Sequence, residues 1–415
     1  MSQCNYIIGD TRDVTAAMPD GSVDLLVTSP PFLALRSYLP DGHPDKHREI
    51  GSEAGPADFL PTLLDLTIEW RRVLAPHGSM CVELGDTFSG SGGENNLYTS
   101  GYSGGAVGLE TKKPTGAPKR TNAGQWPLAK SMCGIPTLYT WSLAYGRNLL
   151  RPEQTFAPWR IRNLIVWARA NPPVGALGDK FRPATSYITV ACTSPTRWFD
   201  LDAVRGEPQE PSARVPERKA LAAEVLGHHG KGMPATGTYH ANGGAPPLDW
   251  HNDNNTGPNG GDILWQLNTA PYAGSHYATY PSELPARLIQ AMCPMQVCTT
   301  CGVPRRRIVE HESTGQNTRK SRGSADDPRQ VGAVSSTFVP KMASVETLGW
   351  TDCGHNTWRN GHVLDPFGGS GTTGLAATGA GRDATLIDID VRNADLARDR
   401  IGMFLNVTEH TKGAA

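Results

Sequence analysis

The chain has 415 residues, and its 39 basic and 40 acidic side chains leave a formal net charge of −1. This balance excludes a uniformly basic nucleic-acid coat and an acidic tail protein, although local basic patches remain compatible with it. With 38% hydrophobic residues, no apolar run long enough to cross a membrane and no signal-peptide core at the start, we expect a cytoplasmic protein.

The first 88 residues predict an alternation of strands and helices. Short buried strands are expected at Tyr6–Ile8, Asp24–Thr28 and Ser79–Leu84. Helices are expected between them, at Val14–Met18 and Pro61–Leu74, the second of which carries apolar residues at helical spacing. Strands that alternate with helices indicate a parallel sheet.

The rest of the chain predicts further elements, separated by loops rich in glycine and proline. These elements are strands at Arg162–Trp167, Ser186–Val190, Val363–Leu364 and Ala384–Asp388, and helices at Pro281–Met292, Thr372–Thr378 and Asp395–Phe404. We therefore expect an α/β fold with a doubly wound, mostly parallel sheet, helices on both faces and loop-rich insertions.

A glycine-rich turn follows the strand at Val363–Leu364 and leads into a helix. Its residues are Asp365, Pro366, Phe367, Gly368, Gly369, Ser370, Gly371 and Thr372. Such a turn brings backbone N–H groups and a helix N-terminus to a nucleotide-like ligand, because glycines allow close approach. It is not a P-loop, since glycine rather than lysine precedes the threonine. Asp388, at the end of the next strand, is placed to accept hydrogen bonds from a ribose diol.

A second motif, Ser29-Pro30-Pro31-Phe32, follows the strand at Asp24–Thr28. Two prolines fix φ and supply no N–H donor, so the turn is stiff. It presents a hydroxyl and a carbonyl that can accept from an exocyclic amine, and an aromatic ring on which a planar base can stack. Enzymes that modify a base within a duplex flip it onto such a surface.

Together the two motifs resemble those of the permuted, S-adenosylmethionine-dependent DNA amino-methyltransferases, the N4-cytosine and N6-adenine family. The resemblance implies a Rossmann-like methyltransferase fold in permuted order, with the catalytic half before the cofactor half. It makes Ser29–Phe32 the catalytic turn and the glycine-rich turn the cofactor turn. It also implies cofactor contacts for Asp10 at the adenine, for Asp388 at the ribose, and for Thr28, Ser275, His276 and Tyr280.

The implied reaction is methyl transfer to the amine of a flipped base in double-stranded DNA. Ser29 before the two prolines favours cytosine N4, and adenine N6 is the alternative. A catalytically silent DNA-binding protein on the same scaffold is the alternative from a different class. A cognate restriction endonuclease as partner and the oligomeric state are left open.

A cysteine and histidine cluster predicts a structural zinc site. Cys298 and Cys301 form a CxxC pair, and Cys353 and His355 follow about fifty residues later. Cys293 or His362 could take the place of His355. A redox CxxC would require a thioredoxin-like context, which the sequence lacks. The other thiols, Cys4, Cys81, Cys133 and Cys192, are isolated and are expected to be small buried residues.

Two basic segments suit DNA phosphates. One spans residues 111–130 and has five basic and no acidic side chains, and the other spans 305–322. The expected divisions are the catalytic half 1–88, a loop-rich insertion 89–150, core strands 151–205, a target-recognition region 206–262, the methionine side of the cofactor site 263–292, a zinc-binding insertion 293–360 and the cofactor-binding half 361–415.

Overall fold

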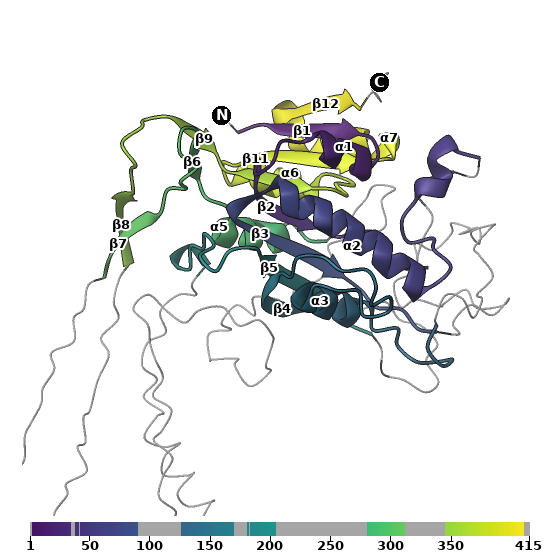
Figure 1. Ribbon diagram of the computed structural model, residues 1–415. Coiled ribbons are helices and arrows are strands. Elements are labelled where there is room, and N and C mark those ends of the chain that lie inside the picture. The colour runs from purple at the N-terminus through teal and green to yellow at the C-terminus, as the bar shows by residue number, and fades with distance from the viewer. Residues whose placement is uncertain are drawn as a thin grey trace, which may run out of the picture. The chain divides into compact units, whose positions relative to one another are not determined.

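The computed structural model describes residues 2–34, 38–40, 42–89, 126–169, 181, 183–204, 280–311 and 345–410 (Figure 1). The chain forms two compact units. The first comprises Met1–Asp200, Leu248–Arg305 and Asp352–Ala415, and the second comprises Leu201–Pro247 and Arg306–Thr351. Among the described residues, no helix has the length and apolar character needed to cross a membrane.

The first unit is built on one eight-stranded sheet with the order β12-β1-β11-β10-β2-β3-β5-β4. Its strands are β1 (Cys4–Ile8), β2 (Val23–Thr28), β3 (Leu74–Leu84), β4 (Arg160–Ala168), β5 (Thr185–Cys192), β10 (His362–Asp365), β11 (Asp383–Asp388) and β12 (Leu405–Glu409). Neighbouring strands run parallel except where β5 pairs with β3 and β4. The predicted mostly parallel α/β fold is confirmed.

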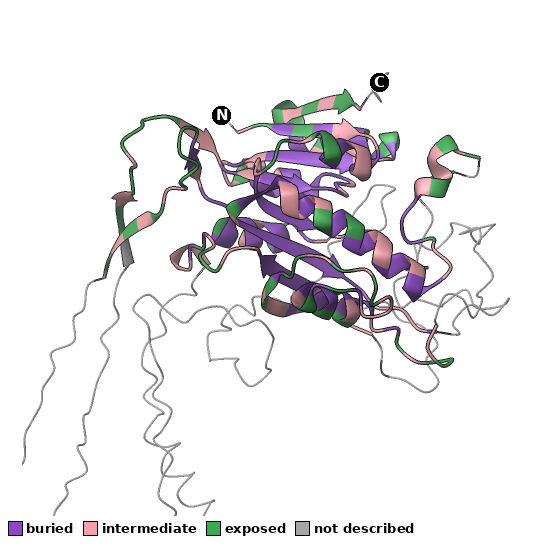
Figure 2. Cartoon of the chain, viewed as in Figure 1, coloured by how far each residue is buried: buried purple, intermediate pink, exposed green. Residues whose placement is uncertain are grey.

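Two groups of helices pack on this sheet. One group is α1 (Thr11–Ala17), α2 (Pro56–Val73) and α3 (Ile135–Tyr145), and the other is α5 (Glu283–Met292), α6 (Thr372–Gly379) and α7 (Val391–Ile401). The long helix α2 buries an apolar face that includes Phe59, Leu63 and Trp70. Figure 2 shows that this face and the central strands form the core.

The strand order joins the two ends of the chain. β1 lies between β11 and β12, so the N-terminal strand is inserted between two C-terminal strands. β10 pairs with β2, where Leu364 lies opposite Leu26. Because both strands are parallel, the turns that follow them emerge side by side at the carboxyl edge of the sheet, as expected for a ligand site in an open α/β fold.

Several element boundaries differ from the sequence-based expectation. α2 begins at Pro56 rather than Pro61, because a proline is tolerated near the start of a helix. α3 was not expected, since several β-branched and aromatic residues lower its helix propensity. α7 begins earlier and ends at Ile401, where Gly402 has a φ of +65°, and β12 follows in place of the expected helix end.

The insertion before β10 contains two short ladders. In the first unit, β6 (Gln296–Cys298) pairs antiparallel with β9 (Trp358–Asn360). In the second unit, β7 (Arg307–His311) pairs antiparallel with β8 (Val345–Trp350). The described part also contains short 3-10 turns, η1 (Pro44–Arg48), η3 (Asp202–Val204) and η5 (Gly402–Phe404).

Candidate active site and metal centre

The two motif turns meet as predicted. Thr28, the last residue of β2, donates its hydroxyl hydrogen to Asp365 Oδ1 at 2.7 Å, and Asp365 is the last residue of β10. The same oxygen accepts from the Phe367 backbone N–H at 3.1 Å. The catalytic and cofactor halves of the chain are therefore tied together directly at the point where both turns begin.

Asp365 also anchors the segment before α5. Its Oδ2 accepts from the Tyr280 hydroxyl at 3.1 Å and from the Thr373 hydroxyl. The carboxyl is 1% exposed, and burial raises its pKa, while these donors and Thr28 act in the opposite direction. Asp365 thus organises three segments that were predicted to surround the cofactor.

The backbone of the glycine-rich turn is held from two neighbouring strands. The Tyr6 hydroxyl of β1 donates to the Gly369 carbonyl at 2.8 Å, and the Gly369 N–H donates to Asp388 Oδ2 at 2.9 Å. Gly369 has a φ of +47°, in the region that favours glycine. Asp388 also accepts from the Asp390 N–H at 2.8 Å, and burial raises its pKa to about 6.

Arg400 of α7 braces the other side of the turn. Its Nη1 donates to the Ser370 hydroxyl at 2.8 Å, to the Ser370 carbonyl at 3.3 Å and to the Thr372 hydroxyl at 2.7 Å. Both hydroxyl-bearing residues are buried. Neither Arg400 nor Tyr6 was identified from the sequence, because each lies in an element remote from the turn and belongs to no motif.

The glycines of the turn are needed partly for packing. A Cβ on Gly368 would lie 2.7 Å from Leu386 Cβ, and one on Gly371 would lie 2.9 Å from Ala397 Cβ. The turn is therefore pressed against β11 and α7, which refines the expectation that its glycines serve close approach to a ligand.

Asp10, the residue expected at the cofactor adenine, lies at the carboxyl end of β1. It caps α1 by accepting from the Arg12 N–H at 2.8 Å, and it forms ion pairs with Arg12 at 3.1 Å and Arg48 at 2.6 Å. Asp390 caps α7 after the neighbouring β11 in the same way and pairs with Arg392. Two carboxylates that cap helices therefore lie at the ends of adjacent strands.

The catalytic turn has a partner that sequence reasoning missed. The Ser29 hydroxyl donates to Glu83 Oε2 at 2.6 Å. Glu83 lies near the end of β3 and is 4% exposed, and burial raises its pKa against the lowering effect of Arg169, whose Nη2 is 3.9 Å from Oε1. The signal available in the sequence was an acidic residue inside the expected apolar strand Ser79–Leu84.

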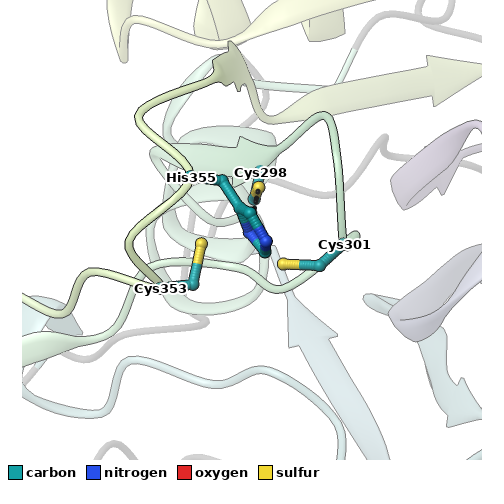
Figure 3. Close-up of side chains that lie close together, drawn as sticks. All are labelled: Cys298, Cys301, Cys353 and His355. Atoms are coloured by element: carbon teal, nitrogen blue, oxygen red, sulfur yellow. Dashed lines mark hydrogen bonds between the residues drawn. The ribbon is translucent and has the colours of Figure 1, made fainter.

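The four predicted metal ligands come together (Figure 3). The ligand atoms of Cys298, Cys301, Cys353 and His355 all lie within 4.8 Å of one another. Three thiols and one imidazole are the donors of a closed, tetrahedral zinc site, so the residues fit the predicted metal. The alternative ligand His362 is engaged elsewhere, with its ring nitrogens 3.0 Å from the Ser22 carbonyl and 2.9 Å from the Thr385 hydroxyl.

The remaining cysteines are buried, as expected for Cys4, Cys81, Cys133 and Cys192, and so is Cys293, the other alternative metal ligand. All five thiols are reduced. Burial raises the pKa of Cys4 and of Cys81 to about 12, which keeps both thiols protonated. They behave as small apolar residues of the core.

Some predicted features lie outside the described residues. These are Ser275 and His276, the target-recognition region 206–262 and most of the two basic segments. The contribution of these residues to the site stays a prediction.

The comparisons with known proteins identify the family. A family model described as DNA methylase, N6_N4_Mtase, matches residues 23–297 and 354–399. The chain therefore belongs to this family of DNA amino-methyltransferases, whose methyl donor is S-adenosylmethionine. The residues between the two matched stretches hold most of the insertion that carries the metal ligands.

The chain is also similar to individual proteins. The chain is similar to the type II methyltransferase M.SmaI of Serratia marcescens, with 22% identity over 401 residues that cover 97% of this chain and 91% of that protein. It is 26% identical to M.Cfr9I of Citrobacter freundii over 276 residues, 66% of this chain and 68% of that protein. A solved structure, PvuII DNA methyltransferase (cytosine-N4-specific), matches 96% of this chain and 86% of its own at 13% identity, with a TM-score of 0.44.

Proposed function

We propose that this chain transfers a methyl group from S-adenosylmethionine to the N4 amine of a flipped cytosine within a specific DNA sequence. The observation that carries the proposal is the hydrogen bond from Ser29 to Glu83 at 2.6 Å. Because the hydroxyl hydrogen is directed to Glu83, the lone pairs of Ser29 Oγ are left to accept a hydrogen bond from the amine of a base.

The chemistry requires orientation and acceptors rather than a covalent intermediate. When bound, the cofactor supplies an electrophilic methyl group on its sulfonium. Ser29 Oγ and the Pro30 carbonyl accept hydrogen bonds from the amine N–H groups, which raises the electron density on the amine nitrogen. The ring of Phe32 stacks against the base. The amine nitrogen would form a bond to the methyl carbon as the methyl–sulfur bond breaks, which leaves a neutral thioether. The proton that the amine loses would pass to Ser29 Oγ, whose own hydroxyl proton would move to the buried Glu83 carboxylate.

The cofactor site is proposed at the carboxyl ends of β10, β11 and β1. The glycine-rich turn would receive the methionine part, Asp388 the ribose hydroxyls and Asp10 the adenine. The hydrogen bonds that Tyr6, Asp388 and Arg400 make to the turn support this assignment, because they fix its backbone from three elements. A preorganised site spends less binding energy on ordering itself.

Cytosine is favoured over adenine by the side chain at position 29. A serine reaches less far from the backbone than aspartate or asparagine, so the amine must approach closely. In the family that the chain resembles, serine at this position goes mostly with cytosine N4. Adenine N6 is the second candidate, since both bases present an exocyclic amine next to a ring nitrogen.

Nucleoside mass spectrometry of DNA treated with the purified protein tests the base. We expect N4-methylcytosine, and methyl groups found only in N6-methyladenine would overturn the cytosine assignment. Transfer to neither base would overturn the proposed activity. Ser29→Ala and Glu83→Gln should each lower kcat while cofactor affinity stays unchanged, because both residues lie on the base side of the site.

The proposed partners are DNA and a restriction endonuclease. Double-stranded DNA is the proposed substrate, and the basic segment 111–130 would neutralise its phosphates. Region 206–262 is proposed to read the sequence. Because M.SmaI and M.Cfr9I are named type II methyltransferases, we also propose a cognate restriction endonuclease, which protection of DNA from digestion would reveal.

A further inference from the structure

Gly85 follows β3 at the carboxyl edge of the sheet and lies against the ring of Phe32. A Cβ at this position would be 2.6 Å from Phe32 Cε2, 2.9 Å from Cδ2 and 3.3 Å from Cζ. Gly85 is buried, and its φ lies outside the left-handed region. Its backbone would therefore accept any residue, and the ring of Phe32 is what a side chain at position 85 would displace.

The backbone of Phe32 is packed against Gly51. The Ala34 N–H donates to the Gly51 carbonyl at 2.7 Å. Gly51 has a φ of +91°, and a Cβ on it would lie 2.8 Å from the Phe32 carbonyl oxygen. The main chain after the catalytic turn is thus closely packed on Gly51. A steric clash caused by a side chain at position 85 would therefore be relieved mainly by movement of the Phe32 ring.

The end of β3 therefore contacts both ends of the catalytic turn. Glu83 accepts from Ser29, and two residues later Gly85 lies under Phe32. The strand end sets the distance between the acceptor for the amine and the ring for the base.

We infer that Gly85 is a positioning residue: its missing side chain places the Phe32 ring at the height at which a flipped base presents its amine to Ser29 and Pro30. This inference rests on the proposed function. Alanine at position 85 would shift the ring, and a base stacked on the shifted ring would bring its amine out of line with the cofactor methyl group. The three atoms nearest a Cβ at position 85 all belong to Phe32, so we expect the cofactor turn to be unaffected.

The experiment is a double-mutant cycle with Gly85→Ala and Phe32→Ala in the full chain, assayed by transfer of labelled methyl groups to unmethylated genomic DNA. We expect Gly85→Ala to lower kcat about 10- to 100-fold, since a misplacement near 1 Å has effects of that size. Cofactor affinity by calorimetry should not change. Gly379→Ala is the matched control, because a Cβ there meets nothing within 4 Å.

The coupling between the two positions decides the inference. In the Phe32→Ala background the space beside Gly85 is open, so Gly85→Ala should lower kcat by less than about twofold further. The melting temperature should follow the same pattern, with Gly85→Ala destabilising only the chain that retains Phe32. Additive effects, or unchanged kcat in Gly85→Ala, would overturn the inference, whereas a wild-type protein that methylates no DNA would overturn the proposed function itself.

Discussion

At the scale of single residues, the site is held together by hydrogen bonds between its own side chains. Asp365 accepts from Thr28, Tyr280 and Thr373, which come from three separate stretches of the chain. A buried carboxylate is tolerated only when donors of this kind surround it. Asp365 is part of the sequence motif, and in the structure its hydrogen bonds to other side chains join the two turns.

The motif residues could be predicted from the sequence because they are contiguous. Ser29–Phe32 and the glycine-rich turn each combine unusual residues in a short stretch that follows an expected strand. Glu83 and Arg400 are single charged residues in ordinary elements. Their roles follow from strand pairing and helix packing, and neither can be derived from local spacing.

Arg400 should matter for cofactor affinity although it is expected to make no contact with the cofactor. Arg400→Ala removes the donors to Ser370 and Thr372, so the turn loses its brace, and we expect Kd for S-adenosylmethionine to rise about tenfold, equivalent to about 1.4 kcal/mol. Calorimetry measures this directly. Arg398→Ala is the control on the same helix, since Arg398 is exposed and pairs with Asp395 at the surface. Equal effects of the two variants would refute the bracing role.

Asp388 predicts a pH dependence of cofactor binding. Burial raises its pKa to about 6, so the carboxylate that would accept the ribose hydroxyls becomes protonated as pH falls through that value. We expect Kd for S-adenosylmethionine to be constant above about pH 7 and to rise below pH 6. Asp388→Asn should bind more weakly and lose this dependence. Titrations of both proteins at several pH values provide the test, and a pH-independent wild type would contradict it.

The same raised pKa has a consequence for stability. A carboxyl whose pKa is higher in the folded than in the unfolded chain contributes stability below its unfolded value, near 3.9, and that contribution is lost as pH rises through about 6. At neutral pH the Asp388 carboxyl is ionised, and its burial in that form destabilises the folded chain. Ligand donors at the ribose position would relieve part of that cost.

At the scale of elements, the strands and helices of the core were predictable where apolar periodicity was strong. β2 is buried along its whole length, and α2 carries a continuous apolar face. α3 was missed because its stability comes from tertiary contacts: Asp86 accepts from the Gly134 N–H at 2.8 Å and the Ile135 N–H at 3.1 Å, which caps the helix from a distant strand end. β12 was missed because an edge strand is mostly solvated and its pattern is weak.

The candidate metal centre is the feature whose four residues were all predicted from the sequence and lie together in the structure. Cysteine and histidine ligands have fixed chemistry, so their spacing is informative before any fold is known. The structure adds that β6 and β9 carry or flank these ligands and pair with each other, with Cys298 opposite Trp358. Metal binding and this short ladder should therefore depend on each other.

Metal analysis of the purified protein should find one zinc per chain. Cys298→Ser should lose it, and hydrogen exchange should become faster across β6 and β9, because three residues on each side make a ladder too short to persist alone. Cys192→Ser, which alters a buried thiol outside the cluster, should keep the metal. Protein that contains no zinc, or full zinc in Cys298→Ser, would rule out the site.

At the scale of the whole molecule, the permuted order explains how distant stretches build one site. β1 and β2 come from the start of the chain, and β10, β11 and β12 from its end, yet they are neighbours in one sheet. Both ends of the chain contribute to this edge of the sheet, because β1 is hydrogen-bonded to β11 on one side and β12 on the other. The motifs indicated this order, while composition and periodicity did not.

The division into two units makes the last prediction. Residues Arg306–Thr351 leave and rejoin the first unit at neighbouring points: the Arg305 side chain lies 3.4 Å from Asp352, and within the second unit the Thr351 N–H donates to the Arg306 carbonyl at 2.9 Å. A linker of about two to four glycine and serine residues can therefore span the gap, since hairpin connections are commonly this short. All four predicted metal ligands and every described residue of the cofactor turn lie outside Arg306–Thr351.

We expect the chain with Arg306–Thr351 replaced by such a linker to fold, to retain one zinc and to bind S-adenosylmethionine with the affinity of the full chain. A shorter connection costs less entropy to close, so the replacement does not by itself destabilise the first unit. Circular dichroism, metal analysis and calorimetry measure the three properties. Loss of cofactor binding in a soluble, zinc-loaded deletion variant would show that the second unit takes part in the cofactor site, and an insoluble product would show that it belongs to the folding core.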